Sequence, residues 1–186
     1  MVITKTGKKG QDWEDHLERG FEKIVCTIVR TDAPVQVLKF EGGKGRFVGY
    51  FKKPGQLDFE GGYTGSHVAF DAKTTKLERF YFKKISDHQL DRMEKCWNLG
   101  EISGLLLRFQ GDDIESDRLF GVGYELIADR ISVENKKSVT LAELEAQIKG
   151  DAPGVHELEY GFDGDLFVRG LYQFMLKLLN RPGRVG

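Results

Sequence analysis

The stretch 56–73 constrains the fold of this chain more than any other, because it predicts two short strands folded back on each other. Over 66–73 the side chains alternate between two faces as a strand requires, so Asp71 and Lys73 lie on the same side. The connection holds three glycines, Gly61, Gly62 and Gly65. Glycine readily adopts the positive φ angles that a turn between antiparallel strands needs. We therefore expect the first arm, 56–60, to lie alongside the second.

If the pairing centres near Thr64, Asp58 lies opposite Asp71. Two carboxylates in that position are about 5 Å apart at Cβ and repel each other. A hard divalent cation such as Mg²⁺ offsets this repulsion, since it takes oxygen ligands and needs only one or two protein carboxylates. Lys73 would then have a phosphate or a metal-bound water as its partner. The alternative is a solvated hairpin whose charges form ordinary surface ion pairs.

Asp58, followed after a short Gly-rich connection by Asp71-Ala72-Lys73, resembles the catalytic motif of the PD-(D/E)xK nuclease superfamily. Further motifs are similar to the RecU family of Holliday-junction resolvases over roughly 10–150. These motifs are Tyr50–Pro54, Tyr63, Gly65, Phe70–Thr74, Asp87–Leu90, Met93, Arg108-Phe109 and Lys137-Ser138. The chain departs from the family pattern in having Asp71 where a glutamate is usual and Leu57 where a small hydroxyl residue is usual.

The resemblance implies an α/β fold of the restriction-endonuclease type, with a mixed central sheet flanked by helices and a projecting β-hairpin stalk at about 35–53. It also implies a nuclease domain over 1–150. The remaining residues, 151–186, are expected to form a C-terminal loop and helix that pack on the core or at a dimer interface.

The resemblance further implies a Mg²⁺ site, in which Mn²⁺ would substitute. Its expected ligands are Asp58, Asp71, the backbone carbonyl of Ala72 and Glu14 on the first helix. The remaining candidate catalytic residues are Lys73, which would position the nucleophile or the scissile oxygen, and Gln89, which would orient water or phosphate. From the residues alone, Glu14 reads equally well as a solvated helix carboxylate and Gln89 as a surface amide.

Charge is distributed unevenly, although the net charge is only −1. Acidic residues dominate the C-terminal half, whereas lysine and arginine load the first third, which is typical of a protein with one face for phosphate. The candidate DNA-binding residues are Lys8, Lys9, Lys39, Lys44, Arg46, Lys52 and Lys53. Five of them, from Lys39 to Lys53, lie along a predicted β-hairpin. Its two strand-like runs, 35–40 and 46–51, are separated by a Gly-rich turn signal. The alternative is a mixed surface without a target.

Other segments have readable patterns. Helical spacing predicts helices over 10–25, 85–99 with Ser86 as N-cap, 140–148 behind a capping box, and 166–180. Apolar runs predict a buried central strand over 103–109 and a shorter strand over 123–127. Residues 150–165, rich in glycine and acidic side chains, read as a loop-like spacer.

The resemblance to the RecU family implies a structure-specific endodeoxyribonuclease that resolves four-way DNA junctions in recombination and repair, working as a homodimer, with a recombinase as a further candidate partner. One alternative is a restriction-like or flap-cutting nuclease of the same fold. Another is a non-catalytic module that binds junctions or modulates a recombinase. The chain has only two cysteines, too few for a disulfide framework, and no apolar run of membrane-spanning length, so a cytoplasmic location without membrane contact is expected.

Overall fold

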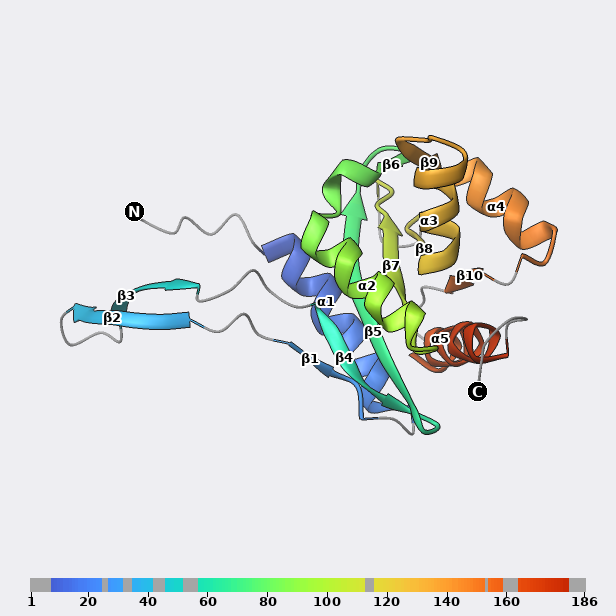
Figure 1. Ribbon diagram of the computed structural model, residues 1–186. Coiled ribbons are helices and arrows are strands. Elements are labelled where there is room, and N and C mark those ends of the chain that lie inside the picture. The colour runs from blue at the N-terminus through green and yellow to red at the C-terminus, as the bar shows by residue number, and fades with distance from the viewer. Residues whose placement is uncertain are drawn as a thin grey trace.

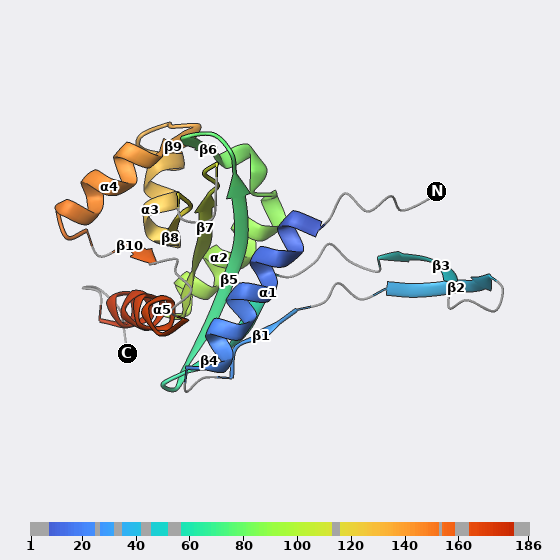
Figure 2. The same cartoon turned by 180° about the vertical axis from the view of Figure 1, so that it is seen from behind.

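Figure 1 shows a computed structural model of the chain. The residues described are 8–24, 27–31, 35–41, 46–51, 57–112, 116–152, 154–158 and 164–180. They form a mixed α/β structure in which helices cover both faces of one central sheet (Figures 1 and 2). This arrangement confirms the fold class that the sequence predicts.

The central sheet has six strands in the order β1-β4-β5-β7-β8-β10. Their bounds are β1 Val29–Arg30, β4 Phe59–Tyr63, β5 Ser66–Thr75, β7 Ile102–Phe109, β8 Arg118–Gly123 and β10 Val155–Leu158. β5 and β7 run parallel, whereas each of the other neighbouring pairs is antiparallel. Every residue of β7 is buried, which confirms the predicted central strand.

The β4–β5 hairpin has the register that the sequence predicts. Phe59 pairs with Phe70 and Tyr63 with Ser66, so the next step of the register sets Asp58 opposite Asp71. The first arm is displaced, however, because β4 begins at Phe59 rather than at residue 56.

The turn itself uses positive φ at only two residues, Thr64 and Gly65. Gly61 and Gly62 lie within β4, so the expectation that they supply positive φ is wrong. Gly61 serves a close approach instead. A Cβ at that position would stand 2.2 Å from the carbonyl oxygen of Thr27, which precedes β1.

α2 (Asp87–Asn98) connects the parallel strands β5 and β7 and lies on one face of the sheet (Figure 1). Ser86 is its N-cap, as predicted. α4 (Leu141–Lys149) contributes to the same face and opens with the predicted capping box of Thr140 and Glu143. Met93 of α2 and Leu144 of α4 both have no exposed surface within the core on this side.

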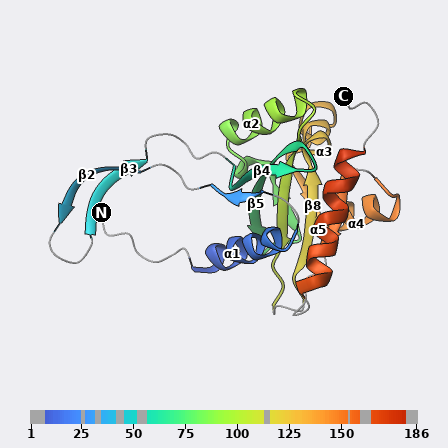
Figure 3. The same cartoon turned by 90° about the horizontal axis from the view of Figure 1, so that it is seen from below.

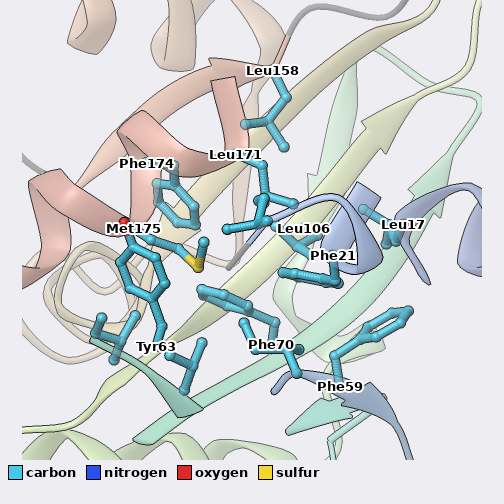
Figure 4. Packing of buried hydrophobic residues seen from close by; sticks show 14 of the residues in the cluster. Leu17, Phe21, Phe59, Tyr63, Phe70, Leu106, Leu158, Leu171, Phe174 and Met175 are labelled. Carbon is cyan, nitrogen blue, oxygen red and sulfur yellow. The ribbon is translucent and has the colours of Figure 1, made fainter. Parts of the chain in front are cut away.

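α1 (Lys8–Glu22) and α5 (Gly164–Leu179) cover the opposite face, and Figure 3 shows α1 and α2 on opposite sides of the sheet. The core between them is aromatic and aliphatic (Figure 4). Phe70 of β5 packs near Phe21 of α1, with ring centroids 6.3 Å apart, and near Phe174 of α5, at 5.6 Å. The last helix therefore docks on the chain's own core.

Two sequence predictions fail on the α3 side of the molecule. Residues 123–127 are predicted as a strand, but β8 already ends at Gly123 and the residues after it form α3 (Tyr124–Ala128). The 150–165 segment, predicted as a spacer, contains β10, which pairs with β8 from Val155 to Leu158. Four residues with only two apolar positions are too short for periodicity to reveal the strand.

Smaller elements complete the described structure. β6 (Arg79–Tyr81) and β9 (Ser138–Thr140) form a two-stranded sheet. A 3-10 turn, η1 (Phe82–Lys84), precedes α2, and a π-helical turn, η2 (Asp129–Val133), follows α3.

β2 (Val35–Glu41) and β3 (Arg46–Phe51) form a separate antiparallel hairpin, as the sequence predicts. Figures 1 and 2 show this hairpin standing away from the body of the molecule. Across the described parts of the chain, the helices are too short or too polar to cross a membrane.

Candidate active site

Asp71 is the centre of the candidate site. It lies in β5 between β4 and β7, and its side chain has no exposed surface. Asp58 faces it from the residue before β4, and the Oδ2 atom of Asp58 accepts a hydrogen bond of 2.9 Å from the backbone N–H of Ala72. The two acids are thus fixed by strand pairing, as the sequence predicts.

Two side chains contact the Asp71 carboxylate from different directions. The Nε2 amide of Gln89 donates a hydrogen bond of 2.7 Å to Oδ1. The Nζ atom of Lys73 lies 2.5 Å from Oδ2. Oδ1 therefore has a hydrogen-bond donor, whereas the buried Oδ2 atom has the ion-pair contact with Lys73 but no hydrogen-bond partner among the described residues. The sequence-predicted residues Asp58, Asp71, Lys73 and Gln89 come together at one place.

The positive charge near Asp71 is too small to compensate for its burial and for the neighbouring acid. Burial first, and then the negative charge of Asp58, raise the pKa of Asp71 to about 7, although Lys73 acts to lower it. One lysine therefore does not compensate for the burial of this acid beside a second one. A dication held between the two carboxylates would supply the missing charge.

Gln89 is held in place by the start of α2. Its Oε1 atom accepts a hydrogen bond of 3.1 Å from the backbone N–H of Ser86, which leaves its amide donor directed at Asp71. The same side chain caps the helix and contacts the acid, so α2 and β5 are coupled at the site.

Glu14 of α1 approaches the site beside Arg30 of β1. The carboxylate of Glu14 forms an ion pair with Nη2 of Arg30, while Nη1 of Arg30 bonds Asp15 at 2.8 Å. Burial raises the pKa of Glu14; Arg30 lowers it, Asp58 raises it and Lys73 lowers it. Glu14 is thus influenced by the charges of Asp58 and Lys73, and in this structure Arg30 holds it by an ion pair.

Sequence reasoning missed Arg30 and Thr31. The hydroxyl of Thr31 donates a hydrogen bond to the carbonyl oxygen of Leu57, and its backbone N–H donates to the carbonyl of Asp58 at 2.8 Å. These contacts tie β1 to the residue that bears the first acid. A strand of two residues carries no periodic signal, so only the arginine's charge marked this segment in the sequence.

The candidate DNA-binding residues are less well defined. Lys8 and Lys9 lie at the start of α1, Lys39 in β2 and Arg46 in β3, but the described structure gives only the backbone there. Lys44, Lys52 and Lys53 lie outside the described residues.

The oxygen donors at the site fit a hard divalent cation. Asp58 and Asp71 provide two carboxylates fixed by strand pairing, and the backbone of Ala72 lies beside both. Mg²⁺ binds through one or two carboxylates and keeps several waters, so this set is sufficient without further protein ligands.

Comparison with known proteins gives one family. The family model described as "RecU: Recombination protein U" matches residues 8–158. A protein of Latilactobacillus sakei named "Holliday junction resolvase RecU" is 26% identical over 155 residues, which cover 77% of this chain and 72% of the relative.

Relatives of the same name from two other species agree. The Staphylococcus aureus protein is 28% identical over 147 residues, which cover 74% of this chain and 70% of the relative. The Pediococcus pentosaceus protein is 29% identical over 112 residues, which cover 55% of this chain and 56% of the relative.

Proposed function

This chain belongs to the RecU family, and we propose from that membership and from the site geometry that it is a nuclease that resolves four-way DNA junctions by Mg²⁺-dependent phosphodiester hydrolysis. The observation that carries the proposal is the fully buried Asp71 opposite Asp58, contacted by Lys73 and Gln89. A surface hairpin with ordinary ion pairs would not bury a carboxylate beside a second acid and a single lysine.

Asp58, Asp71 and the carbonyl oxygen of Ala72 would hold the Mg²⁺, with Glu14 as a further ligand directly or through water. The bound ion lowers the pKa of water and stabilises charge on the phosphate. To bind the metal, Glu14 would have to give up its ion pair with Arg30. Arg30 would then be available to a DNA phosphate, for which a guanidinium is well suited.

Lys73 and Gln89 would position the reacting groups. The ammonium of Lys73 has three donors, of which the Asp71 carboxylate occupies one direction, so it can also hold the attacking water or a scissile phosphate oxygen. Gln89 fixes Oδ1 of Asp71 and thereby the direction in which that acid presents its other oxygen. Catalysis would depend on positioning and electrostatics, since hydrolysis of this kind needs no covalent intermediate.

The four-way junction as substrate rests on the family and on the names of the relatives. A junction has two-fold symmetry, so paired incisions require two active sites, and a symmetric homodimer provides them. The β2–β3 hairpin, with Lys39 and Arg46 in its strands, stands away from the body and would enter the junction centre. A recombinase as an additional partner remains part of this proposal.

The test compares a labelled immobile four-way junction with a linear duplex of the same sequence, each with Mg²⁺ and with EDTA. We expect symmetric nicks in the junction only, and only with Mg²⁺. Equal cleavage of the linear duplex would favour a restriction-like nuclease. Tight junction binding without cleavage in Mg²⁺ or Mn²⁺ would contradict the nuclease and favour a binding module.

A further inference from the structure

A second group of metal-ligating side chains lies away from the acid pair. In the part of the chain that the structure describes, His67, Cys96 and Glu101 offer one ligand atom each, and these atoms all lie within 4.8 Å of one another. The three residues come from the start of β5, the end of α2 and the residue before β7. The fold thus gathers them from three separate elements.

We propose that His67, Cys96 and Glu101 form a zinc site, distinct from the Mg²⁺ site, that fixes the end of α2 to the central sheet. Imidazole, thiolate and carboxylate are the three ligand types that proteins use for Zn²⁺, whereas a thiolate is not a ligand for Mg²⁺. The proposal rests on this geometry alone and does not depend on the nuclease function.

The distances fit a site that closes around the ion. Zinc bonds of about 2.0–2.3 Å in a tetrahedron place ligand atoms roughly 3.3–3.8 Å apart. His67 Nδ1 already lies 3.0 Å from Glu101 Oε2, and all three ligand atoms lie within 4.8 Å of each other. Side-chain movements of about 1 Å therefore suffice, without a change in the strands.

The surroundings of His67 resemble those of a metal ligand. Its second ring nitrogen, Nε2, faces the Glu60 carboxylate at 3.8 Å. Glu60 is itself held by two hydrogen bonds from Arg92, at 3.0 and 2.9 Å. A zinc-bound histidine commonly directs its other N–H at a carboxylate, which fixes the ring and its tautomer. Glu60 would have this role.

Access to the site is sufficient for an ion to enter. Cys96 is buried, but the side chains of His67 and Glu101 are 32% and 25% exposed, so a water can occupy the fourth position. On binding, the Cys96 thiol becomes a thiolate and its proton passes to solvent. The site would have three protein ligands and one water.

The position of the site gives it a structural role. Cys96 lies seven residues beyond Gln89 on α2, which is roughly 10 Å along a helix, and His67 lies four residues before Asp71 on β5, roughly 13 Å along a strand. Zinc would therefore fix the end of α2 that lies far from the acid pair, while Gln89 fixes the near end.

The test uses protein carrying Cys26→Ser, so that Cys96 is the single thiol, titrated with Co²⁺ and then with Zn²⁺ at pH 8. We expect a near-ultraviolet thiolate-to-cobalt absorption band that one equivalent of Zn²⁺ removes. Cys96→Ala should abolish the band. His67→Ala and Glu101→Gln should each weaken zinc affinity at least tenfold, and Glu60→Gln by about 10-fold to 100-fold.

The control is the double variant Asp58→Asn, Asp71→Asn, which should keep both the band and the zinc affinity because it alters only the acid pair. Absence of the band in the Cys26→Ser protein would overturn the proposal, as would a zinc affinity unchanged by His67→Ala and Glu101→Gln. Loss of the zinc affinity in the double variant would also overturn it. If circular dichroism shows Cys96→Ala unfolded, the two variants at the partly exposed ligands decide the result.

Discussion

Asp71 combines three properties that are unfavourable in a metal-free protein. It is fully buried, it faces Asp58, and among the described residues its one cationic neighbour is Lys73. Burial of a charge is tolerated when partners satisfy it, and here the partners satisfy only part of it. This arrangement supports the proposal that Asp71 is a metal ligand.

The first prediction concerns the pH dependence of stability without metal. The pKa of Asp71 is about 7 in the folded protein and close to its ordinary value of 3.8 when unfolded. The folded state therefore binds the proton more tightly. The penalty for the ionised carboxylate is complete above pH 7 and is relieved as the pH falls from 7 towards 4.

In EDTA, the wild type should consequently gain unfolding free energy relative to Asp71→Asn as the pH is lowered through this window. Urea unfolding of both proteins at pH 8, 6 and 5 measures the difference. A difference that stays constant, or that changes in the opposite direction, would contradict the surroundings assigned to Asp71.

At this scale the strand pattern predicts how the two acids face each other, and the family resemblance predicts that Lys73 and Gln89 lie with them. Alternation and the Gly-rich turn place Asp58 opposite Asp71, and the structure has that register. The burial of Asp71 could not be predicted, since it depends on α2 and on the neighbouring strand β7. Arg30 and Thr31 were missed because β1, which contains Arg30 and ends just before Thr31, is only two residues long.

At the scale of elements, the start of α2 is linked to the central sheet through its capping residue Gln89, which contacts Asp71 of β5. Gln89 accepts from the backbone N–H of Ser86 and donates to Asp71, so the position of the acid depends on the start of this helix. The capping signal was readable in the sequence, but the contact with Asp71 was not, because it joins residues 18 positions apart through tertiary packing.

The second prediction separates these two roles of Gln89. Gln89→Ala should lower the rate of junction cleavage by about 10-fold to 100-fold, the usual effect of losing a side chain that orients a metal ligand. Ser86→Ala is the matched control, because it weakens the same cap by about 1 kcal/mol and leaves the Gln89 amide available to Asp71. Thermal unfolding and single-turnover cleavage of both variants provide the measurements.

We expect Ser86→Ala to cleave at nearly the wild-type rate but to unfold at a lower temperature than the wild type. If the two variants lose cleavage equally, Gln89 acts only through helix stability, and its contact with Asp71 has no catalytic consequence.

Elements without strong periodicity account for the errors in the sequence reading. The apolar residues of 123–127 are compatible with a strand or with a buried helix. In the structure β8 ends at Gly123, and the residues that follow form α3. β10 is specified mainly by the free edge of β8, with which it pairs from Val155 to Leu158. Such pairings depend on partners distant in sequence, which a local pattern does not contain.

At the scale of the whole molecule, α5 is part of the core although it lies beyond residue 158, where the family match ends. Phe174, Met175 and Leu171 have no exposed surface. Phe174 also lies directly over Gly121 of β8, where a Cβ would stand 2.4 Å from its ring. The described fold is therefore incomplete without the C-terminal helix.

The third prediction follows from this packing. Phe174→Ala should lower the free energy of unfolding by about 3–5 kcal/mol, since it removes a buried aromatic ring and leaves a cavity. Tyr172→Ala, on the 41% exposed side chain of the same helix, should cost less than about 1 kcal/mol. Urea unfolding of the two variants is the measurement, and equal losses would show that α5 contributes no specific core packing.

We propose that Asp71 binds the metal used for cleavage while other residues hold the DNA. The most direct test of this proposal is junction cleavage in Mg²⁺ and junction binding in EDTA for the wild type and for Asp71→Asn, which preserves the size of the side chain. We predict a loss of cleavage of at least about a hundredfold with binding affinity unchanged. Cleavage retained by Asp71→Asn would contradict the account.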